Sequence, residues 1–140
     1  MLKTKTGTLS ISTKGDTEIV DITKKIENVL NESKLQEGVV TVSVVGSTAA
    51  ITTMEYEQAL IKDFKEIFET LIPQNKRYHH DNTWGDANGY AHLRSSIVGS
   101  SKTFPFSDGK LLLGAWQQIV LIDFDNRPRH RKIVLQFIGI

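Results

Sequence analysis

The sequence predicts an α+β protein in which two main helices pack on an antiparallel, sandwich-like β-sheet. Two long segments have the apolar spacing of a helix, whereas most of the second half consists of short β-branched runs separated by Gly, Asp and Pro. The 140 residues have the length of one ordinary domain, and no linker or internal repeat divides them. We therefore expect a single domain over residues 1–140.

The first half of the chain contains both predicted helices. Residues 4–13 are rich in Thr and β-branched residues and lead into a Gly-containing turn, which predicts a strand. Residues 22–33 have apolar side chains at helical spacing behind capping oxygens. Five of the eight residues 38–45 are Val, which predicts a strand inside the sheet. Residues 55–71 form an amphipathic helix that Pro73 ends.

The second half reads as successive antiparallel strands. The expected strands cover residues 93–98, 110–113, 116–124 and 131–138. Trp116 is expected in the core. Several strands carry apolar residues on both faces, so the sheet needs a layer packed on each of its two faces. A neighbouring subunit could supply the second cover. The connection over residues 74–91 has no periodicity, and a stretch of about 18 such residues in a compact domain is more often functional than idle.

Composition excludes several classes of function. The net charge of +1, from 17 basic and 16 acidic side chains, gives no general attraction for nucleic acid or an anionic membrane. Without Cys, thiolate nucleophiles, iron–sulfur clusters and Cys-based zinc sites are excluded. No stretch approaches the roughly 20 apolar residues of a membrane span, and the N-terminus has no apolar signal region. We expect a cytoplasmic protein with no nucleic-acid or membrane partner.

Residues 78–92 hold three of the four histidines together with carboxylates, amides and a Trp. His80, His92 and Asp86 can form a set of two nitrogens and one oxygen that leaves coordination positions open, as catalytic metal sites do. The alternative is that these histidines tie the loop down through hydrogen bonds. His79 and His80 are adjacent and point to opposite sides of an extended segment, so only one faces the site, and we favour His80.

Three further features are candidates for anion or ligand binding. Ser47 and Thr48 lie in a turn of small residues after the Val-rich strand, and suit either phosphate binding or close packing. Arg129 and Arg131 alternate onto one side of an extended chain, where they suit a diphosphate, a solvated edge or a salt bridge. Gln117 is polar at the start of an apolar strand, which indicates that its amide reaches into a pocket or an interface.

Longer motifs identify a family. Residues 80–93 and 112–119, followed by residues 123–125 and 128–129, resemble the signatures of the YjbQ-like proteins, and the likeness extends from residue 21 to the C-terminus. The resemblance implies a small sandwich-like α+β protein that assembles as a homotrimer. It also implies secondary thiamine-phosphate synthase activity, in which hydroxymethylpyrimidine diphosphate is joined to a thiazole phosphate and diphosphate is released.

The resemblance assigns site residues by position. The matching residues are His80, Asp86, Asn88, His92, Gln117 and Arg129. Ser47, Thr48 and the Ala that follows keep the pattern after the buried strand, but Gly46 stands where many members have a His, and Met54 stands where an Asn is usual. This version looks like that of some archaeal relatives, and it removes one imidazole from the expected site.

The implied mechanism is departure of diphosphate from a stabilised cation. Arg129 and the Ser47–Thr48 turn would hold phosphate oxygens. A divalent metal, Mg²⁺ or Zn²⁺, would bind Asp86 and the diphosphate or the two imidazoles, and His80 and His92 would otherwise donate to the leaving oxygen. Two alternatives remain: a metal-dependent hydrolase or lyase of a small phosphorylated metabolite, and a non-catalytic trimeric ligand-binding module. Each of them requires both imidazoles to face one cavity.

Overall fold

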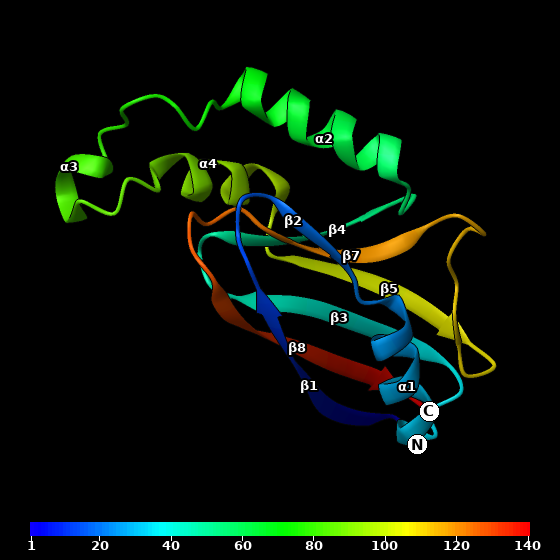
Figure 1. Ribbon diagram of the computed structural model, residues 1–140. Coiled ribbons are helices and arrows are strands. Elements are labelled where there is room, and N and C mark those ends of the chain that lie inside the picture. The colour runs from blue at the N-terminus through cyan, green and yellow to red at the C-terminus, as the bar shows by residue number, and fades with distance from the viewer.

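The computed structural model describes residues 1–140 and confirms the α+β class with curled antiparallel sheets (Figure 1). The strands are β1 (Lys3–Thr13), β2 (Glu18–Asp21), β3 (Gly38–Val45), β4 (Ala49–Met54), β5 (Ser101–Ser107), β6 (Lys110–Leu111), β7 (Gln118–Asp123) and β8 (Arg129–Gly139). The helices are α1 (Thr23–Ser33), α2 (Gln58–Leu71), α3 (Asp81–Trp84) and α4 (Gly89–Val98). None of them is long and apolar enough to span a membrane.

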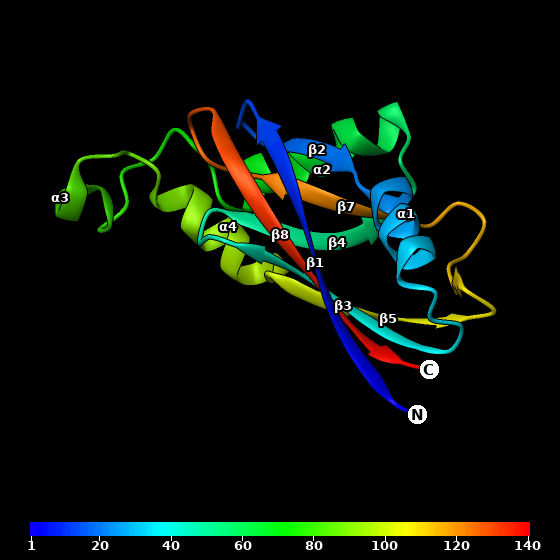
Figure 2. The ribbon, with the colours of Figure 1, turned by 90° about the horizontal axis from the view of Figure 1, so that it is seen from below.

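The strands form two antiparallel sheets that pack face to face. The large sheet has the order β1-β8-β3-β5-β6 and the small sheet the order β2-β7-β4. Helices α2 and α4 cover the outer face of the small sheet (Figure 1). Figure 2 shows α1 at one end of the sandwich and α3 projecting at the opposite end. The protein is therefore layered as large sheet, small sheet and helices.

Strand β7 lies at the centre of this arrangement and explains its apolar sequence. Ile119 and Leu121 point into the core between the two sheets, whereas Val120 and Ile122 point into the core beneath α2 and α4. All four are fully buried, and burying a side chain of this size contributes about 1.5–3 kcal/mol. The small sheet thus receives its second cover from helices of the same chain, a role that we considered a neighbouring subunit could fill.

The predicted strand over residues 93–98 is wrong, because this segment is the second half of α4. The buried face of that helix is formed largely by Tyr90, Ala91, Arg94 and Ser95, at helical spacing but only partly apolar. Its exposed face carries apolar side chains, and Ile97 is 71% exposed. Apolar side chains therefore lie partly on the exposed face of the helix, and their spacing does not mark its buried face.

Other differences concern short elements and one aromatic residue. Strands β2, β4 and β5 were not expected, and α3 and the start of α4 lie in the connection over residues 74–91 that we expected to be irregular. The prediction that Trp116 lies in the core is also wrong, since its side chain is 76% exposed in the turn before β7. The strand begins only at Gln118, so Trp116 does not share its alternation.

Candidate functional site

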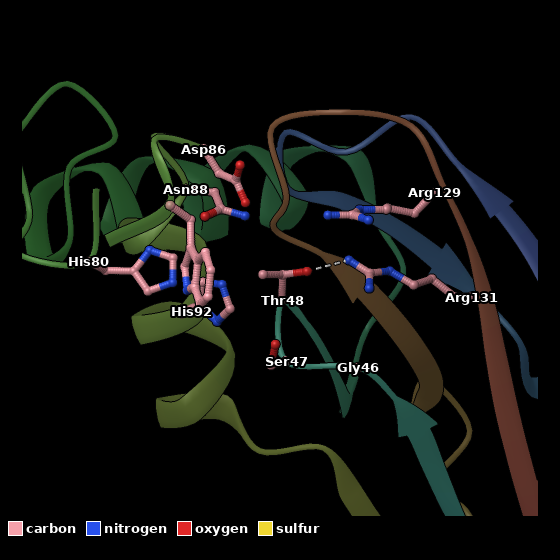
Figure 3. A pocket seen from close by; sticks show the side chains of 10 residues that line it. Gly46, Ser47, Thr48, His80, Asp86, Asn88, His92, Arg129 and Arg131 are labelled. Carbon is pink, nitrogen blue, oxygen red and sulfur yellow. Dashed lines mark hydrogen bonds between the residues drawn. The ribbon is translucent and has the colours of Figure 1, made fainter. Parts of the chain in front are cut away.

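A polar cavity of about 440 Å³ lies at the α3 end of the sandwich, where three connections meet (Figure 3). One wall comes from the α3–α4 region and consists of His80, Trp84, Asp86, Asn88 and His92. The opposite wall comes from the β3–β4 turn and the start of β8, and consists of Gly46, Ser47, Thr48, Arg129 and Arg131. The tertiary structure thus brings most of the predicted site residues together.

The two imidazoles share one wall of the cavity, as the predicted chemistry requires. The ring centroids of His80 and His92 lie 4.3 Å apart with the planes tilted by 41°. Burial, followed by the charge of His80, lowers the pKa of His92 below its ordinary value. His92 is therefore neutral at pH 7. The adjacent His79 is exposed and does not line the cavity.

Asp81, rather than a histidine, ties down the loop that carries His80. Its carboxylate accepts hydrogen bonds from the backbone N–H groups of Tyr78 (2.9 Å) and Gly89 (3.0 Å). These two bonds lower the pKa of Asp81 below its ordinary value. The buried Nδ1 of His80 has no hydrogen-bond partner. The structure thus gives no support to the alternative that the His80 ring serves to anchor the loop.

The guanidinium of Arg131 is fixed by a buried carboxylate. Its Nε and Nη2 donate to the two oxygens of Asp123 at 2.7 and 2.8 Å, and Nη2 also donates to Thr48 Oγ1 at 2.7 Å. Arg131 is 6% exposed and Asp123 is fully buried. A bidentate pair of this kind restricts the guanidinium to one orientation.

Asp125 is a second buried carboxylate and binds four neighbours. It accepts from Thr48 Oγ1 (3.0 Å), Asn88 Nδ2 (3.2 Å), the backbone N–H of Asn126 (2.8 Å) and Arg129 Nε (2.9 Å). Burial alone would raise the pKa of the Asp125 carboxyl, but these hydrogen bonds outweigh it and hold the pKa below its ordinary value. Asp125 is thus ionised at neutral pH and connects both walls of the cavity.

These contacts limit which predicted residues can donate to a phosphate. Thr48 and Asn88 line the cavity, but the Thr48 hydroxyl hydrogen and the Asn88 amide already bond to Asp125. Donors without a partner in the chain remain on Ser47, on Nη1 of Arg129 and on Nη1 of Arg131. Gly46, with φ +150°, leaves space for Nη1 of Arg131, because a Cβ atom there would lie 2.9 Å from this nitrogen. Gly46 thus leaves this guanidinium edge open.

Gln117 lies outside the cavity. Its Nε2 donates to Thr53 Oγ1 at 3.3 Å, and its Oε1 accepts from the backbone N–H of Gly114 at 2.9 Å. It precedes β7, whereas Asp123 at the end of that strand reaches the site, and six strand residues span roughly 20 Å. The prediction that Gln117 binds substrate is therefore not supported by its position.

The predicted metal set of His80, His92 and Asp86 does not form a coordination centre. No group of three His, Asp or Glu side chains in the chain lies close enough together to hold a metal ion. Asp86 is exposed, and Figure 3 shows it beyond Asn88 from the two rings. The donors present fit at most a metal ion that brings other ligands with it, such as Mg²⁺ on a phosphate, which needs only one or two protein carboxylates.

Sequence reasoning did not assign Asp123 and Asp125 to the site. The sequence does contain an indication of their role, however. Two acidic residues precede a turn and two arginines follow it, and the members of each pair are two positions apart. In extended chain such spacing directs both members of a pair to one side. Phe124 between them points instead into the core beneath the helices.

The fold and the site define a class of small α+β proteins: two packed antiparallel sheets with a cavity lined by imidazole and guanidinium groups at one end. Residues 7–140 match the family described as UPF0047 protein YjbQ-like. The chain belongs to this family, which confirms the predicted resemblance.

Curated relatives come from archaea and bacteria. The chain is 36% identical over 128 residues to a UPF0047 protein of Archaeoglobus fulgidus, covering 91% of this chain and 97% of the relative. It is 32% identical to the UPF0047 protein YugU of Bacillus subtilis, covering 94% and 98%.

Solved structures share the fold. A YbjQ-like protein of unknown function from Sulfolobus solfataricus matches with a TM-score of 0.93 at 30% identity over 100% of both chains. A hypothetical protein from Aeropyrum pernix matches with a TM-score of 0.90 at 32% identity, covering 97% of this chain and 99% of that one.

Proposed function

We propose that the cavity binds a small phosphorylated metabolite and that the protein is a transferase of the thiamine-phosphate synthase type. It would join hydroxymethylpyrimidine diphosphate to a thiazole phosphate and release diphosphate. The observation that carries the proposal is that guanidinium groups and a pair of imidazoles face one cavity of about 440 Å³ from opposite walls. Cavities of this size accommodate small metabolites.

The wall of the cavity that carries Arg129 and Arg131, here called the guanidinium wall, is suited to bind phosphate oxygens. The charges of Arg129 and Arg131 are balanced by Asp125 and Asp123, so the wall supplies directed hydrogen-bond donors rather than excess positive charge. Because Asp123 holds Arg131 in place, its open Nη1 does not have to reorganise when a phosphate binds. A charge-assisted hydrogen bond of this kind contributes about 1.5–3 kcal/mol.

The wall that carries His80 and His92 suits hydrogen bonding to the leaving group. His92 is neutral at pH 7 because of its lowered pKa, and His80 lies against it with a buried nitrogen that lacks a partner. We assign these two rings the role of hydrogen-bond donors to the leaving oxygen. A Mg²⁺ ion carried by the diphosphate would neutralise developing charge, and Asp86 at the rim is the carboxylate able to hold it.

The test is a coupling assay with both substrates and Mg²⁺, in which thiamine phosphate is measured by chromatography. His80→Gln and His92→Gln are each expected to lower turnover by about 100-fold or more, the usual cost of removing a hydrogen-bond donor to developing negative charge. His79→Gln, next to the site but exposed, is the matched control and should keep full activity. No product above the protein-free blank, or unchanged turnover in both site variants, contradicts the proposal. Phosphate release without coupling would indicate a hydrolase.

The homotrimer is also a proposal. Large apolar side chains are exposed on α3 and α4, with Trp84 73% and Ile97 71% exposed. Such side chains on neighbouring elements suit contact with a further copy of the chain. Sedimentation velocity should give three times the monomer mass of 15.7 kDa, and Ile97→Glu should shift the protein towards monomer. A monomer at micromolar concentration would contradict this assembly.

A further inference from the structure

Two buried polar atoms at the cavity have no partner within the chain. Buried side-chain polar atoms are almost always hydrogen-bonded, so each exception requires an explanation. The exceptions here are Asn88 Oδ1, His80 Nδ1 and the Tyr90 hydroxyl, and the first two belong to residues that line the cavity. Asn88 is only 3% exposed. Asn88, a residue of the cavity lining, therefore has an unused hydrogen-bond acceptor that is held inside the protein.

The orientation of the Asn88 amide is fixed by Asp125. Its Nδ2 donates to Asp125 Oδ1 at 3.2 Å, and an ionised carboxylate can only accept. The opposite amide orientation would place the Asn88 oxygen against the carboxylate oxygen. Asp125 is itself fully buried and held by Thr48 and Arg129. The amide therefore has one stable orientation, with Oδ1 left over for another partner.

The cavity lining therefore combines groups of both hydrogen-bond polarities. Arg131, Ser47 and the two imidazoles offer donors, whereas Asn88 Oδ1 can only accept. A phosphate, which presents only acceptor oxygens at its ionised positions, cannot satisfy Asn88 Oδ1. The partner of that atom must carry an N–H or O–H group.

We propose that Asn88 is a specificity-determining residue and that Asp125 is its positioning residue. The ligand carries a hydrogen-bond donor, an amino or hydroxyl group, on the part remote from its phosphate, and Asn88 Oδ1 accepts from this group. The inference rests on the proposed function only for the phosphate end. It adds that phosphorylated compounds without such a donor are rejected, because they leave a buried acceptor unpaired.

The test compares probes that differ in one donor. Aminobenzyl phosphates with the amine at the ortho, meta or para position are compared with the methylbenzyl phosphates of the same shape, and pyrophosphate probes the anion wall alone. Dissociation constants are measured by titration calorimetry on the full chain. At least one amino compound is expected to bind about tenfold or more tightly than its methyl counterpart.

Variants separate the two residues. Asn88→Leu removes the acceptor at similar size and should abolish the preference for the amine while pyrophosphate still binds. Asn31→Leu, at an exposed position on α1, is the matched control and should keep it. Asp125→Asn removes the carboxylate that orients Asn88 and balances Arg129, so the preference should fall while pyrophosphate binds as tightly or more tightly. If Asn88 and Asp125 had a purely structural role, their variants would bind the amino compounds and pyrophosphate more weakly by similar factors.

A measurement on the unmodified protein complements the variants. The Asn88 side-chain amide hydrogens should exchange slowly with solvent in NMR spectra, since Asp125 accepts one of them. Rapid exchange, or equal binding of every amino and methyl pair, overturns this inference and leaves the proposed function standing. Failure to bind pyrophosphate at all overturns the proposed function and this inference with it.

Discussion

Replacing Arg131 by methionine tests the buried carboxylate on which the guanidinium wall depends. Asp123 accepts four hydrogen bonds, two of them from Arg131 at 2.7 and 2.8 Å, one from Thr13 Oγ1 at 2.5 Å and one from the backbone N–H of Asp125 at 3.0 Å. Methionine keeps the apolar stem but removes two of these bonds and the only charge that directly pairs with Asp123.

The expected cost follows from the burial of that carboxylate. Asp123 is fully buried, and leaving one charge of a buried pair without its partner destabilises a protein by about 3–5 kcal/mol. For a domain of this size, each kcal/mol lowers Tm by roughly 3 °C, so Arg131→Met should melt about 10–15 °C lower. The double variant Asp123→Asn/Arg131→Met should recover a large part of this loss, because no unpaired charge remains buried.

The assay is urea unfolding followed by circular dichroism for the wild type, both single variants and the double variant. Lys132→Met, exposed on the same strand, is the control and should change the free energy of unfolding by less than about 0.5 kcal/mol. A loss below about 1 kcal/mol for Arg131→Met, or a double variant no more stable than the Arg131 variant, would refute the reasoning.

Three further predictions concern pH and single side chains. Burial lowers the pKa of His92, so the native protein binds fewer protons than the unfolded chain, and the free energy of unfolding falls as the pH drops below about 6.5. His92→Gln should reduce this pH dependence of the free energy of unfolding, measured by urea unfolding between pH 5 and 7, whereas His79→Gln should not. An equal pH dependence in the wild type and the His92 variant would contradict the role assigned to His92. Tyr90→Phe removes a buried hydroxyl without a partner and should leave stability unchanged or raise it by about 1 kcal/mol; a loss would show that the hydroxyl has one. Gly15→Ala should lower the free energy of unfolding by more than about 3 kcal/mol, because φ is +88° and the new Cβ would lie 2.5 Å from a backbone carbonyl oxygen. Gly85→Ala, with φ +74° and open space around the position, should lower it by only about 1–2 kcal/mol. Similar losses of stability in the two variants would show that the contact at Gly15 is unimportant.

The elements that the sequence predicted are those whose own side chains carry the burial pattern. The Val-rich run became β3 in the interior of the large sheet, and the amphipathic segment ending before Pro73 became α2. Helix α4 was missed because its buried face includes Arg94, whose guanidinium donates to Glu69 and to the carbonyl of Ile72. A helix buried through such contacts has no apolar period to detect.

The residues of the candidate site were likewise predicted only in part. His80 and His92 were recognised because residue type alone indicates chemistry, and the fold brings their rings to 4.3 Å. Gln117 was chosen because it is polar at the start of an apolar strand and matches a family motif, but the length of β7 separates it from the cavity. Asp125 was overlooked, although it connects both walls, because its role consists of hydrogen bonds to residues distant in sequence.

Local patterning, residue chemistry and family motifs by themselves determined the α+β class, the position of most strands and the loop in which reactive side chains gather. Only the tertiary structure decided which of those side chains face one another and which donors remain open. A hydrogen atom already shared with Asp125 is unavailable to a ligand, and that depends on packing between segments far apart along the chain.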